Sequence, residues 1–540
     1  MNIKILQRAL NVSPFQRKII VIIIRLNMNT PIPIIDVFAG PGGLGEGFSS
    51  LISDNGQPIF KIRLSIEKDD YAHKTLQLRA FFRQFAPKNM PSEYYEYLKG
   101  EISKETLFQK YPRQFAMAQN EAWKIELGMK NREVVKKRIG EELKGVTNWV
   151  LIGGPPCQAY SLVGRSRIRG KNKRKYREDR RHHLYKEYLQ ILSDHQPSVF
   201  IMENVKGLLS SKRVRTENTF ELILSDLKHP NKAMLTGTNS SLSYKLFSLS
   251  QKYLPGKDFA PKDFVIRSEE YEIPQARHRV IIFGIREDLF KSTPDVLKKK
   301  SQRVTINDVI DDLPKLRSGL SKGDDSPEKW LNAILAIENA IWKDAVSDKI
   351  AETLDSELKK VNAKLSRGAA FIATSKRPRK HVGWYVDSKL KGICNHESRS
   401  HIPDDLRRYF FAAIFARVNR RSPTLSDFPK VLLPNHKNVT EALSGSKFND
   451  RFRVQLRGKP STTVVSHISK DGHYYIHYDP TQCRSLSVRE AARLQTFPDN
   501  YFFEGNRTQQ YHQVGNAVPP LLAKKIATIV YKVLNSSNHV

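Results

Sequence analysis

A cysteine in a proline-bounded loop is the residue with the clearest chemical capability in this sequence. Cys157 follows Gly-Gly-Pro-Pro at 153–156, and these four residues come directly after an apolar run at 149–152. The two prolines restrict the loop and hold the thiol in one place. A free thiol with a pKa of about 8.5 is several per cent ionised at neutral pH, so it can act as a nucleophile without a partner base. We expect this role for Cys157, whereas Cys394 and Cys483 are expected to be inert buried hydrophobes.

Two further candidates, one acid and a pair of arginines, lie beside other apolar runs. Glu203 follows Phe-Ile-Met at 200–202, and burial beside such residues raises the pKa of a carboxyl group and allows it to donate a proton. The alternative is a strand-end acid that caps the next turn. Arg277 and Arg279 precede the apolar run 280–285 and could present a guanidinium to a carbonyl or a phosphate. A solvated basic turn is equally compatible with these two arginines.

A glycine-rich turn follows the first apolar run of the chain. Residues 36–45 read Asp-Val-Phe-Ala-Gly-Pro-Gly-Gly-Leu-Gly, and glycines after a strand let the backbone approach a ligand closely. The spacing is neither that of a dinucleotide fingerprint nor that of a P-loop. Glu67 ends the next predicted strand and could bind both hydroxyls of a ribose, so we expect a ribose-bearing cofactor. A plain structural turn is the alternative.

The order of these motifs resembles that of the cytosine-5 DNA methyltransferase family. The resemblance covers residues 33–286 and 484–534, and the order of the motifs makes it specific. In chain order the matching motifs are Asp36-x-Phe38-x-Gly40-x-Gly42-Gly43, the strand-end Glu67, Gly-Gly-Pro-Pro-Cys157-Gln with Ser161, Glu203-Asn-Val, Gln275-x-Arg277-x-Arg279, the stretch 484–498, and Gly515-Asn516-Ala-Val-Pro-Pro520.

The resemblance implies transfer of a methyl group from S-adenosylmethionine to carbon 5 of cytosine in a specific double-stranded DNA sequence, on a base flipped out of the duplex. Cys157 would add to carbon 6 and so make carbon 5 nucleophilic. Glu203 would hold or protonate ring nitrogen 3. Arg279, with Arg277 beside it, would bind the ring carbonyl at position 2. The implied fold is a Rossmann-like, mostly parallel α/β domain with a smaller recognition domain, and no metal is implied.

The resemblance also assigns a cofactor site. Two positions depart from the family pattern: Lys68 stands where an aromatic residue often follows the strand-end acid, and the usual Gly-Asp-Ile is matched only by Gly100-Glu101-Ile102. Glu101 would then contact the adenine amino group. The other implied cofactor residues are Phe38, Ala39, Gly40, Pro41, Gly42, Gly43, Leu44, Glu67, Leu184 and Asn516.

The charge of the chain favours nucleic acid as a partner. Ninety Lys and Arg against 55 Asp and Glu give a net charge of +35, which repels itself unless a polyanion neutralises it. A basic surface kept for solubility is the alternative. Ten of the 17 residues at 165–181 are Lys or Arg, and in the family this loop closes over DNA. The DNA contacts expected from the resemblance are Arg165, Arg167, Arg169, Lys171 and Thr463.

Short apolar runs and turn glycines predict the elements that position these residues. Apolar runs alternating with helical patterns indicate a parallel α/β sheet, and its ligands lie beyond the carboxyl ends of the strands. The predicted strands are 33–38, 61–67, 149–152, 198–202 and 280–285, and the predicted helices are 121–127, 132–143, 184–192, 487–494 and 519–534.

A length of 540 residues predicts more than one domain. We expect residues 1–27 to be an extension before the native start at Met28, and residues 28–290 to form the catalytic domain with a helical insert at 80–147. Residues 291–483, which we call the recognition region, have no βα pattern and are expected to read DNA. Residues 484–540 are expected to return to the catalytic domain.

Several classes of protein are excluded or left as alternatives. The longest N-terminal apolar run, 19–24, is too short to cross a bilayer or to act as a secretory signal, and three cysteines exclude a disulfide scaffold. We therefore expect a soluble protein of the bacterial cytoplasm. Cys394, His396 and His401 lack a fourth zinc ligand of suitable spacing, so we expect no metal and place both histidines at the surface.

The functional alternatives are a transfer RNA cytosine methyltransferase and a catalytically silent DNA-binding relative. The first has a small recognition region in this family, and the second has no need of intact catalytic motifs. We expect a monomeric modification enzyme that acts on double-stranded DNA, with a cognate restriction endonuclease as a separate partner.

Overall fold

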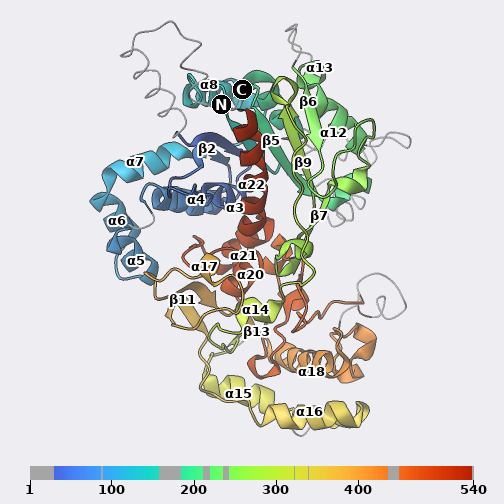
Figure 1. Ribbon diagram of the computed structural model, residues 1–540. Helices are drawn as coiled ribbons and strands as arrows, with labels where there is room; N and C mark the ends of the chain where they lie inside the picture. The colour runs from blue at the N-terminus through green and yellow to red at the C-terminus, as the bar shows by residue number, and fades with distance from the viewer. Residues whose placement is uncertain are drawn as a thin grey trace, which may run out of the picture.

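The computed structural model describes residues 30–86, 89–156, 184–210, 219–234, 242–321, 323–337, 340–435, 439 and 449–537. The expected extension at 1–27 lies outside the described residues. A central sheet has the strand order β3-β2-β1-β4-β5-β9-β6, with β7 paired to β9 (Figure 1). Its strands are β1 (Ile32–Val37), β2 (Phe60–Glu67), β3 (Ala122–Lys124), β4 (Val150–Gly153), β5 (Val199–Val205), β6 (Tyr244–Phe247), β7 (Val265–Arg267) and β9 (His278–Arg286).

The predicted parallel α/β sheet is confirmed. Strands β3, β2, β1, β4 and β5 run parallel to their neighbours, whereas β9 runs antiparallel to β5, β6 and β7. The parallel strands are near-continuous apolar runs because both faces of such a sheet are covered. Their carboxyl ends meet at one edge, where the glycine-rich turn, Glu67, the loop after Gly153 and Glu203 follow one another.

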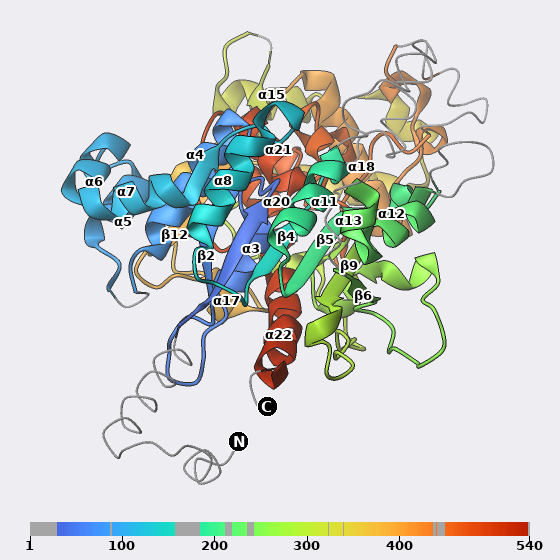
Figure 2. The ribbon, with the colours of Figure 1, turned by 90° about the horizontal axis from the view of Figure 1, so that it is seen from above.

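Helices cover both faces of the sheet and complete two separate hydrophobic cores. Successive strand residues point to opposite faces, so that Ile34 lies in one core and Ile35 in the other. Figure 2 shows the sheet and the helices that cover it from above. The first core contains α3 (Gly43–Ser49) and α22 (Pro520–Ser537), and the second contains α8 (Arg132–Glu142), α11 (Leu184–His195) and α12 (Thr219–Lys228), with α13 (Pro230–Met234) beside them.

The described part of the insert at 80–147 consists of helices joined by loops, with one edge strand among them. A helix predicted over 121–127 is wrong, because α7 ends at Glu121 and the next residues form the edge strand β3. The backbone N–H of Ile125 donates to the Glu67 carbonyl at 3.2 Å, so pairing with β2 outweighs the helical propensity of so short a segment. The helices before this strand are α4 (Asp70–Arg83), α5 (Ser92–Lys99), α6 (Lys104–Lys110) and α7 (Pro112–Glu121).

The recognition region builds a core of its own at the end of the molecule opposite the sheet (Figure 1). Trp330, Leu354 and Tyr409, from three different helices, are almost fully buried in it. Within the described ranges, the helices of the region include α14 (Ile306–Ile310), α15 (Pro327–Leu335), α16 (Asp348–Leu358), α17 (Val382–Tyr385) and α18 (Pro403–Asn419), and its strands include β10 (Gly319–Leu320), β11 (Gly368–Ala373), β12 (Gly392–Glu397), β13 (Ser400–His401) and β14 (Ser461–Thr462).

The segment after residue 484 is divided between two cores. Helices α20 (Val488–Leu494) and α21 (Arg507–Asn516) share a core with residues 304–313 and 464–475 of the recognition region, whereas α22 packs on the sheet. No helix in the described ranges combines the length and the apolar character that crossing a membrane requires.

Buried arginines hold the recognition region to α20. Arg489 donates to the carbonyls of Cys394, Pro498 and Tyr501 at 2.6–2.8 Å. Arg493 donates to the Val309 carbonyl at 2.8 Å and to Asp312 Oδ1 at 2.6 Å. A buried guanidinium is tolerated only when its donors are paired, so these contacts fix how the two segments sit against each other.

Two glycines of the first helix allow its close contact with α22. A Cβ atom at Gly43 would lie 2.3 Å from the Val518 carbonyl oxygen, and one at Gly47 would lie 2.4 Å from both the Pro520 carbonyl oxygen and the Ala523 Cβ. The glycine-rich stretch therefore has a packing role that is separate from ligand binding.

We predict that Gly47→Ala lowers the free energy of unfolding by about 1–3 kcal/mol, because the added methyl group overpacks the α3–α22 contact. Urea denaturation followed by circular dichroism measures the change. The matched control is Gly140→Ala in α8, where the nearest atom to the new Cβ lies 3.8 Å away, and this substitution should raise stability by up to about 1 kcal/mol. Equal stability of the two variants would contradict the packing role.

Candidate active site

An acid and an arginine form a buried pair at the carboxyl edge of the sheet. Arg279 Nε lies 2.9 Å from Glu203 Oε1, and each side chain is 13% exposed. Because β9 runs antiparallel to β5, Arg279 near its start lies opposite Val205 at the end of β5. Burial lowers the pKa of Arg279, and the Glu203 carboxylate opposes that shift. The pair can hold a ring that offers a carbonyl beside a ring nitrogen.

The loop that carries the cysteine begins against this pair. A Cβ atom at Gly154 would lie 3.1 Å from Glu203 Oε2, and Asn204 Nδ2 donates to the Pro155 carbonyl at 3.2 Å. The described residues thus bring the start of the Pro-Pro-Cys loop to Glu203. Cys157 lies outside the described residues, as do Arg165, Arg167, Arg169 and Lys171.

Arg277 is not part of a solvated basic turn. Its side chain is buried, with the whole residue 2% exposed. Its Nη1 donates to the Val464 carbonyl at 2.7 Å and its Nη2 to the Gly515 carbonyl at 3.3 Å. Burial and the nearby Arg279 lower the pKa of this guanidinium. Arg277 therefore contacts the recognition region and the Gly515-Asn516 motif rather than open space.

Thr463 lies at the joint between the recognition region and the catalytic segment. Strand β14 pairs in parallel with β8 (Gln275–Ala276). The hydroxyl of Thr463 donates to the Ala276 carbonyl at 2.7 Å. The N–H of Val464 donates to Gln275 Oε1 at 2.8 Å. The predicted DNA contact is thus anchored beside the two arginines.

The glycine-rich turn and Glu67 form one unit at the ends of β1 and β2. Glu67 Oε2 accepts the Gly40 N–H at 2.7 Å, and its Oε1 accepts the N–H groups of Lys68 and Asp69 at 2.8 Å. A carboxylate has about four acceptor sites, so the held group keeps capacity for a hydroxyl. A Cβ atom at Gly40, where φ is +58°, would meet no atom within 4 Å, so the turn leaves open space beside Glu67. This arrangement fits a ribose-bearing cofactor.

The other predicted cofactor residues divide between holding the turn and facing outward. Phe38 has a left-handed backbone with φ of 55°, as has Gly42 with φ of 96°. The Ala39 N–H donates to the Ile66 carbonyl at 3.1 Å. The Pro41 carbonyl accepts a hydrogen bond from the Tyr501 hydroxyl, and Gly43 and Leu44 are buried. Leu184 is half-buried at the start of α11, and Asn516 is exposed at the end of α21.

An acid that the sequence reasoning missed lies beside Lys68, the residue after Glu67. Glu126 follows the edge strand β3, and its Oε1 lies 2.9 Å from Lys68 Nζ. Glu101 instead follows the end of α5, where it lies 3.9 Å from Lys99 Nζ, and α5 contacts β11. The alternation of Trp123 and Ile125 with polar residues was the available signal, because it marks a strand whose following acid joins the cofactor edge.

The two histidines expected at the surface are buried, so that expectation is wrong. The imidazole of His396 lies 2.8 Å from both Ser487 Oγ and the Pro314 carbonyl oxygen. His401 contacts Ser485 and Tyr409. Burial lowers the pKa of His396 to about 4, as expected for an imidazole that packs α20 against the recognition region. Among the described residues, no group of three or more His, Cys, Asp or Glu side chains is placed to hold a metal ion.

The remaining cysteines have the character that was expected. Cys394 and Cys483 are buried and free, and burial raises the pKa of Cys394 to about 12. A thiol that stays protonated at neutral pH is a poor nucleophile.

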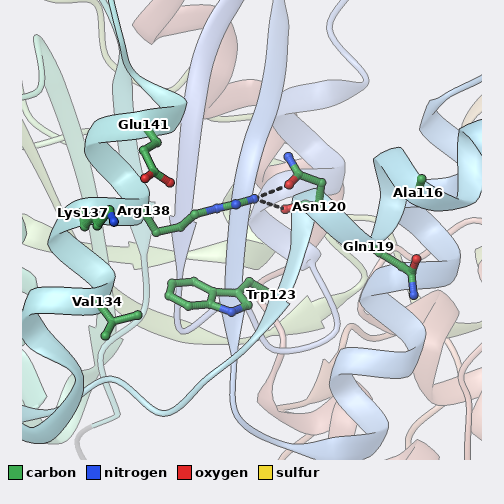
Figure 3. Close-up of a pocket in the computed structure, with 8 residues that line it drawn as sticks. All are labelled: Ala116, Gln119, Asn120, Trp123, Val134, Lys137, Arg138 and Glu141. Carbon is green, nitrogen blue, oxygen red and sulfur yellow. Dashed lines mark hydrogen bonds between the residues drawn. The ribbon is translucent and has the colours of Figure 1, made fainter.

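A groove of about 550 Å³ lies beyond the edge strand, between α7 and α8 (Figure 3). The Arg138 guanidinium crosses it and donates to the backbone carbonyl of Asn120 at 3.1 Å and also to the Asn120 side chain. Among the described residues, none of those predicted for catalysis or cofactor binding lines this groove. Its lining consists of Ala116, Gln119, Asn120, Trp123, Val134, Lys137, Arg138 and Glu141.

A buried carboxyl group lies beneath the glycine-rich turn. Asp36 of β1 is opposite Ser65 of β2, both are inaccessible to solvent, and neither side chain has a hydrogen-bond partner among the described residues. Burial raises the pKa of Asp36 from its ordinary 3.8 to about 8; the Arg83 charge opposes this shift and the Glu67 charge adds to it. The Asp36 carboxyl group is therefore largely protonated at neutral pH.

Comparison with known proteins identifies relatives along most of the chain. Residues 118–231 and 252–532 match the family model for C-5 cytosine-specific DNA methylase. The type II methyltransferase M.Bpa9945I of Bacillus paralicheniformis is 32% identical over 93% of this chain and 99% of its own length. The DNA (cytosine-5-)-methyltransferase M.ApeKI of Aeropyrum pernix is 27% identical over 73% of this chain and 83% of its own. A solved structure described as a DNA modification methyltransferase of an Escherichia coli prophage covers 93% of this chain and 99% of its own, with 18% identity and a TM-score of 0.45.

We predict that Asp36 makes stability fall as pH rises. The folded state holds a proton on Asp36 up to about pH 8, whereas the unfolded state loses it near about pH 4, so the stability cost accumulates between these values. Asp36→Asn should remove this cost, and its thermal midpoint should exceed that of the unaltered protein by more at pH 8.5 than at pH 5. The exposed Asp54→Asn serves as control. A difference that does not change with pH would contradict the prediction.

Proposed function

The chain belongs to the family of C-5 cytosine-specific DNA methylases, and from that premise we propose that it methylates carbon 5 of a cytosine within a specific double-stranded DNA sequence. It is a DNA cytosine-5 methyltransferase, and the proposal concerns how and where it acts. The observation that supports it most is the buried Glu203–Arg279 pair against the start of the Cys157 loop.

The acid and the arginine recognise the ring of the target base. A base stacked in a duplex cannot reach a buried pair, so the cytosine must be flipped out at a cost of a few kcal/mol. Arg279 then donates to the ring carbonyl at position 2, and Glu203 holds or protonates ring nitrogen 3. Both contacts stabilise the charge that develops on the ring, and they are strong because the pair is shielded from water.

Cys157 supplies covalent catalysis. Its thiolate adds to carbon 6, a sulfur–carbon bond forms, and the electron pair of the 5,6 double bond moves so that carbon 5 becomes a nucleophile. After carbon 5 has been alkylated, loss of its proton restores the double bond and breaks the sulfur–carbon bond. The proton from carbon 5 passes to a water molecule, and the proton on ring nitrogen 3 returns to Glu203. The sulfur keeps the electron pair of the broken sulfur–carbon bond, so the Cys157 thiolate is regenerated.

The cofactor site is proposed at the carboxyl ends of β1, β2 and β3. S-adenosylmethionine, when bound, supplies an electrophilic methyl group. Gly40 provides the close backbone approach and Glu67 accepts the ribose hydroxyls. Asn516 and Glu126 add exposed polar groups, and Glu126 is the acid proposed for the adenine amino group in place of Glu101. The carboxylate held by three backbone N–H groups supports this assignment.

The biological role proposed is that of a modification enzyme in a restriction–modification system of the bacterial cytoplasm. The relatives named as type II methyltransferases support it. One chain carries every catalytic motif, so a monomer suffices, and the cognate endonuclease would act separately on the same sequence. Basic residues at 165–171 and Thr463 are proposed to contact the DNA backbone.

We predict that bisulfite sequencing of DNA from a methylation-free host that expresses this chain finds protected cytosines in one short recurring sequence. The protection should be absent with Cys157→Ala, because the covalent step then has no nucleophile. If the protein is folded and binds S-adenosylmethionine but no cytosine in the DNA is protected from bisulfite, the proposal is contradicted. Bisulfite sequencing of host RNA would then separate an RNA methyltransferase from a silent DNA-binding relative.

We also predict that a duplex with 5-fluorocytosine at the target position forms a covalent complex with the protein when S-adenosylmethionine is present. Fluorine cannot leave carbon 5 as a proton does, so the bond to Cys157 persists and survives denaturing electrophoresis. Cys157→Ser should form no adduct, and Glu203→Gln should slow its formation by a factor on the order of 10²–10³. An adduct mapped to any other residue would refute the assigned nucleophile.

A further inference from the structure

One buried guanidinium connects three segments that lie far apart in the chain. Arg277 donates to the carbonyl of Val464 at 2.7 Å and to the carbonyl of Gly515 at 3.3 Å. Val464 adjoins Thr463 of the recognition region, and Gly515 adjoins Asn516 of the cofactor site. Arg277 itself stands two residues before Arg279. The side chain therefore touches the recognition segment and the cofactor segment at once, from within the segment that holds the target base.

The two segments held by Arg277 also press directly against each other. A Cβ atom at Gly515 would lie 2.3 Å from the backbone nitrogen of Ser466 and the carbonyl carbon of Val465. The Tyr475 hydroxyl accepts the Val465 N–H at 3.1 Å and donates to the Thr463 carbonyl at 2.9 Å. The backbone at 463–466 is thus fixed on both sides, and a shift of either segment moves the other.

The electrostatics of Arg277 make these contacts hard to give up. The guanidinium is buried, Arg279 lies nearby with the same charge, and Arg277 Nε has no hydrogen-bond partner among the described residues. Losing either carbonyl would leave a buried cation with still fewer partners, which is costly. The energy of Arg277 is therefore low only when the recognition and cofactor segments are both in place.

We propose that Arg277 is a positioning residue that couples recognition of the DNA target to binding of S-adenosylmethionine. This inference rests on the proposed function. Because Arg277 holds the Val464 and Gly515 carbonyls together, a shift of the 463–466 segment on DNA binding is passed through the guanidinium to the Gly515-Asn516 segment at the cofactor. Because coupling between two binding sites is reciprocal, the cofactor tightens DNA binding by the same factor.

The test measures the affinity for S-adenosylhomocysteine, the demethylated product, by calorimetry with and without a duplex that carries the sequence found by bisulfite sequencing. We expect the duplex to raise that affinity by about 5–150-fold in the unaltered protein, the usual range for coupled sites. In Arg277→Met the ratio should fall to about 1–2, and in Arg277→Lys it should lie between the two. A role in stability alone would lower the unfolding temperature without changing this ratio.

Two further variants keep the test decisive. Arg267→Met removes an exposed arginine of β7 whose Nη1 lies 3.8 Å from Glu270, and it should leave the ratio unchanged. Thr463→Val removes the hydrogen bond to the Ala276 carbonyl and should lower the ratio, so it carries the test if the Arg277 variants do not fold. A ratio of one in the unaltered protein would overturn the proposal, and so would an unchanged ratio in folded Arg277→Met. If the Arg277 variants do not fold, an unchanged ratio in Thr463→Val would overturn it. The duplex comes from a successful methylation experiment, so either result concerns Arg277 and leaves the proposed function standing.

Discussion

The reversed direction of β9 is the constraint on which the site depends. Parallel strands all end at the same edge of the sheet, so each delivers to that edge only the residues at or after its carboxyl end, such as Glu203 near the end of β5. A strand that runs the other way begins at that edge and delivers the residues near its start. Arg279 therefore meets Glu203 across a strand pair, and both are fixed by backbone hydrogen bonds rather than by a loop.

The recognition region is attached to the rest of the molecule through buried charge. Arg493 donates to Asp312 Oδ1 at 2.6 Å. Arg484 donates to the Leu316 carbonyl at 3.2 Å, and Arg489 donates to the Cys394 carbonyl at 2.6 Å. Burying such ions costs several kcal/mol each, and breaking one pair leaves an unpaired charge that costs about 3–5 kcal/mol. The orientation of the region is therefore fixed by a few highly directional contacts.

Residues whose position follows from local sequence were predictable, and those fixed by distant partners were not. The sheet and the positions of Glu203 and Glu67 at its carboxyl edge could be predicted from apolar runs that end in glycine or an acid, because such runs and turn residues are local signals. The edge strand before Glu126 was missed since it exists only by pairing with β2. The two carbonyls that Arg277 binds belong to Val464 and Gly515, which come 187 and 238 positions later in the chain. No local sequence pattern indicates contacts over such separations.

The α3–α22 contact affects how this protein folds during its synthesis. Helix α3 and the strands behind it leave the ribosome several hundred residues before α22, yet α22 completes one of the two cores of their sheet. During synthesis that apolar face stays uncovered while the whole recognition region is produced. A nascent chain with such a long-range closure folds slowly and exposes hydrophobic surface meanwhile.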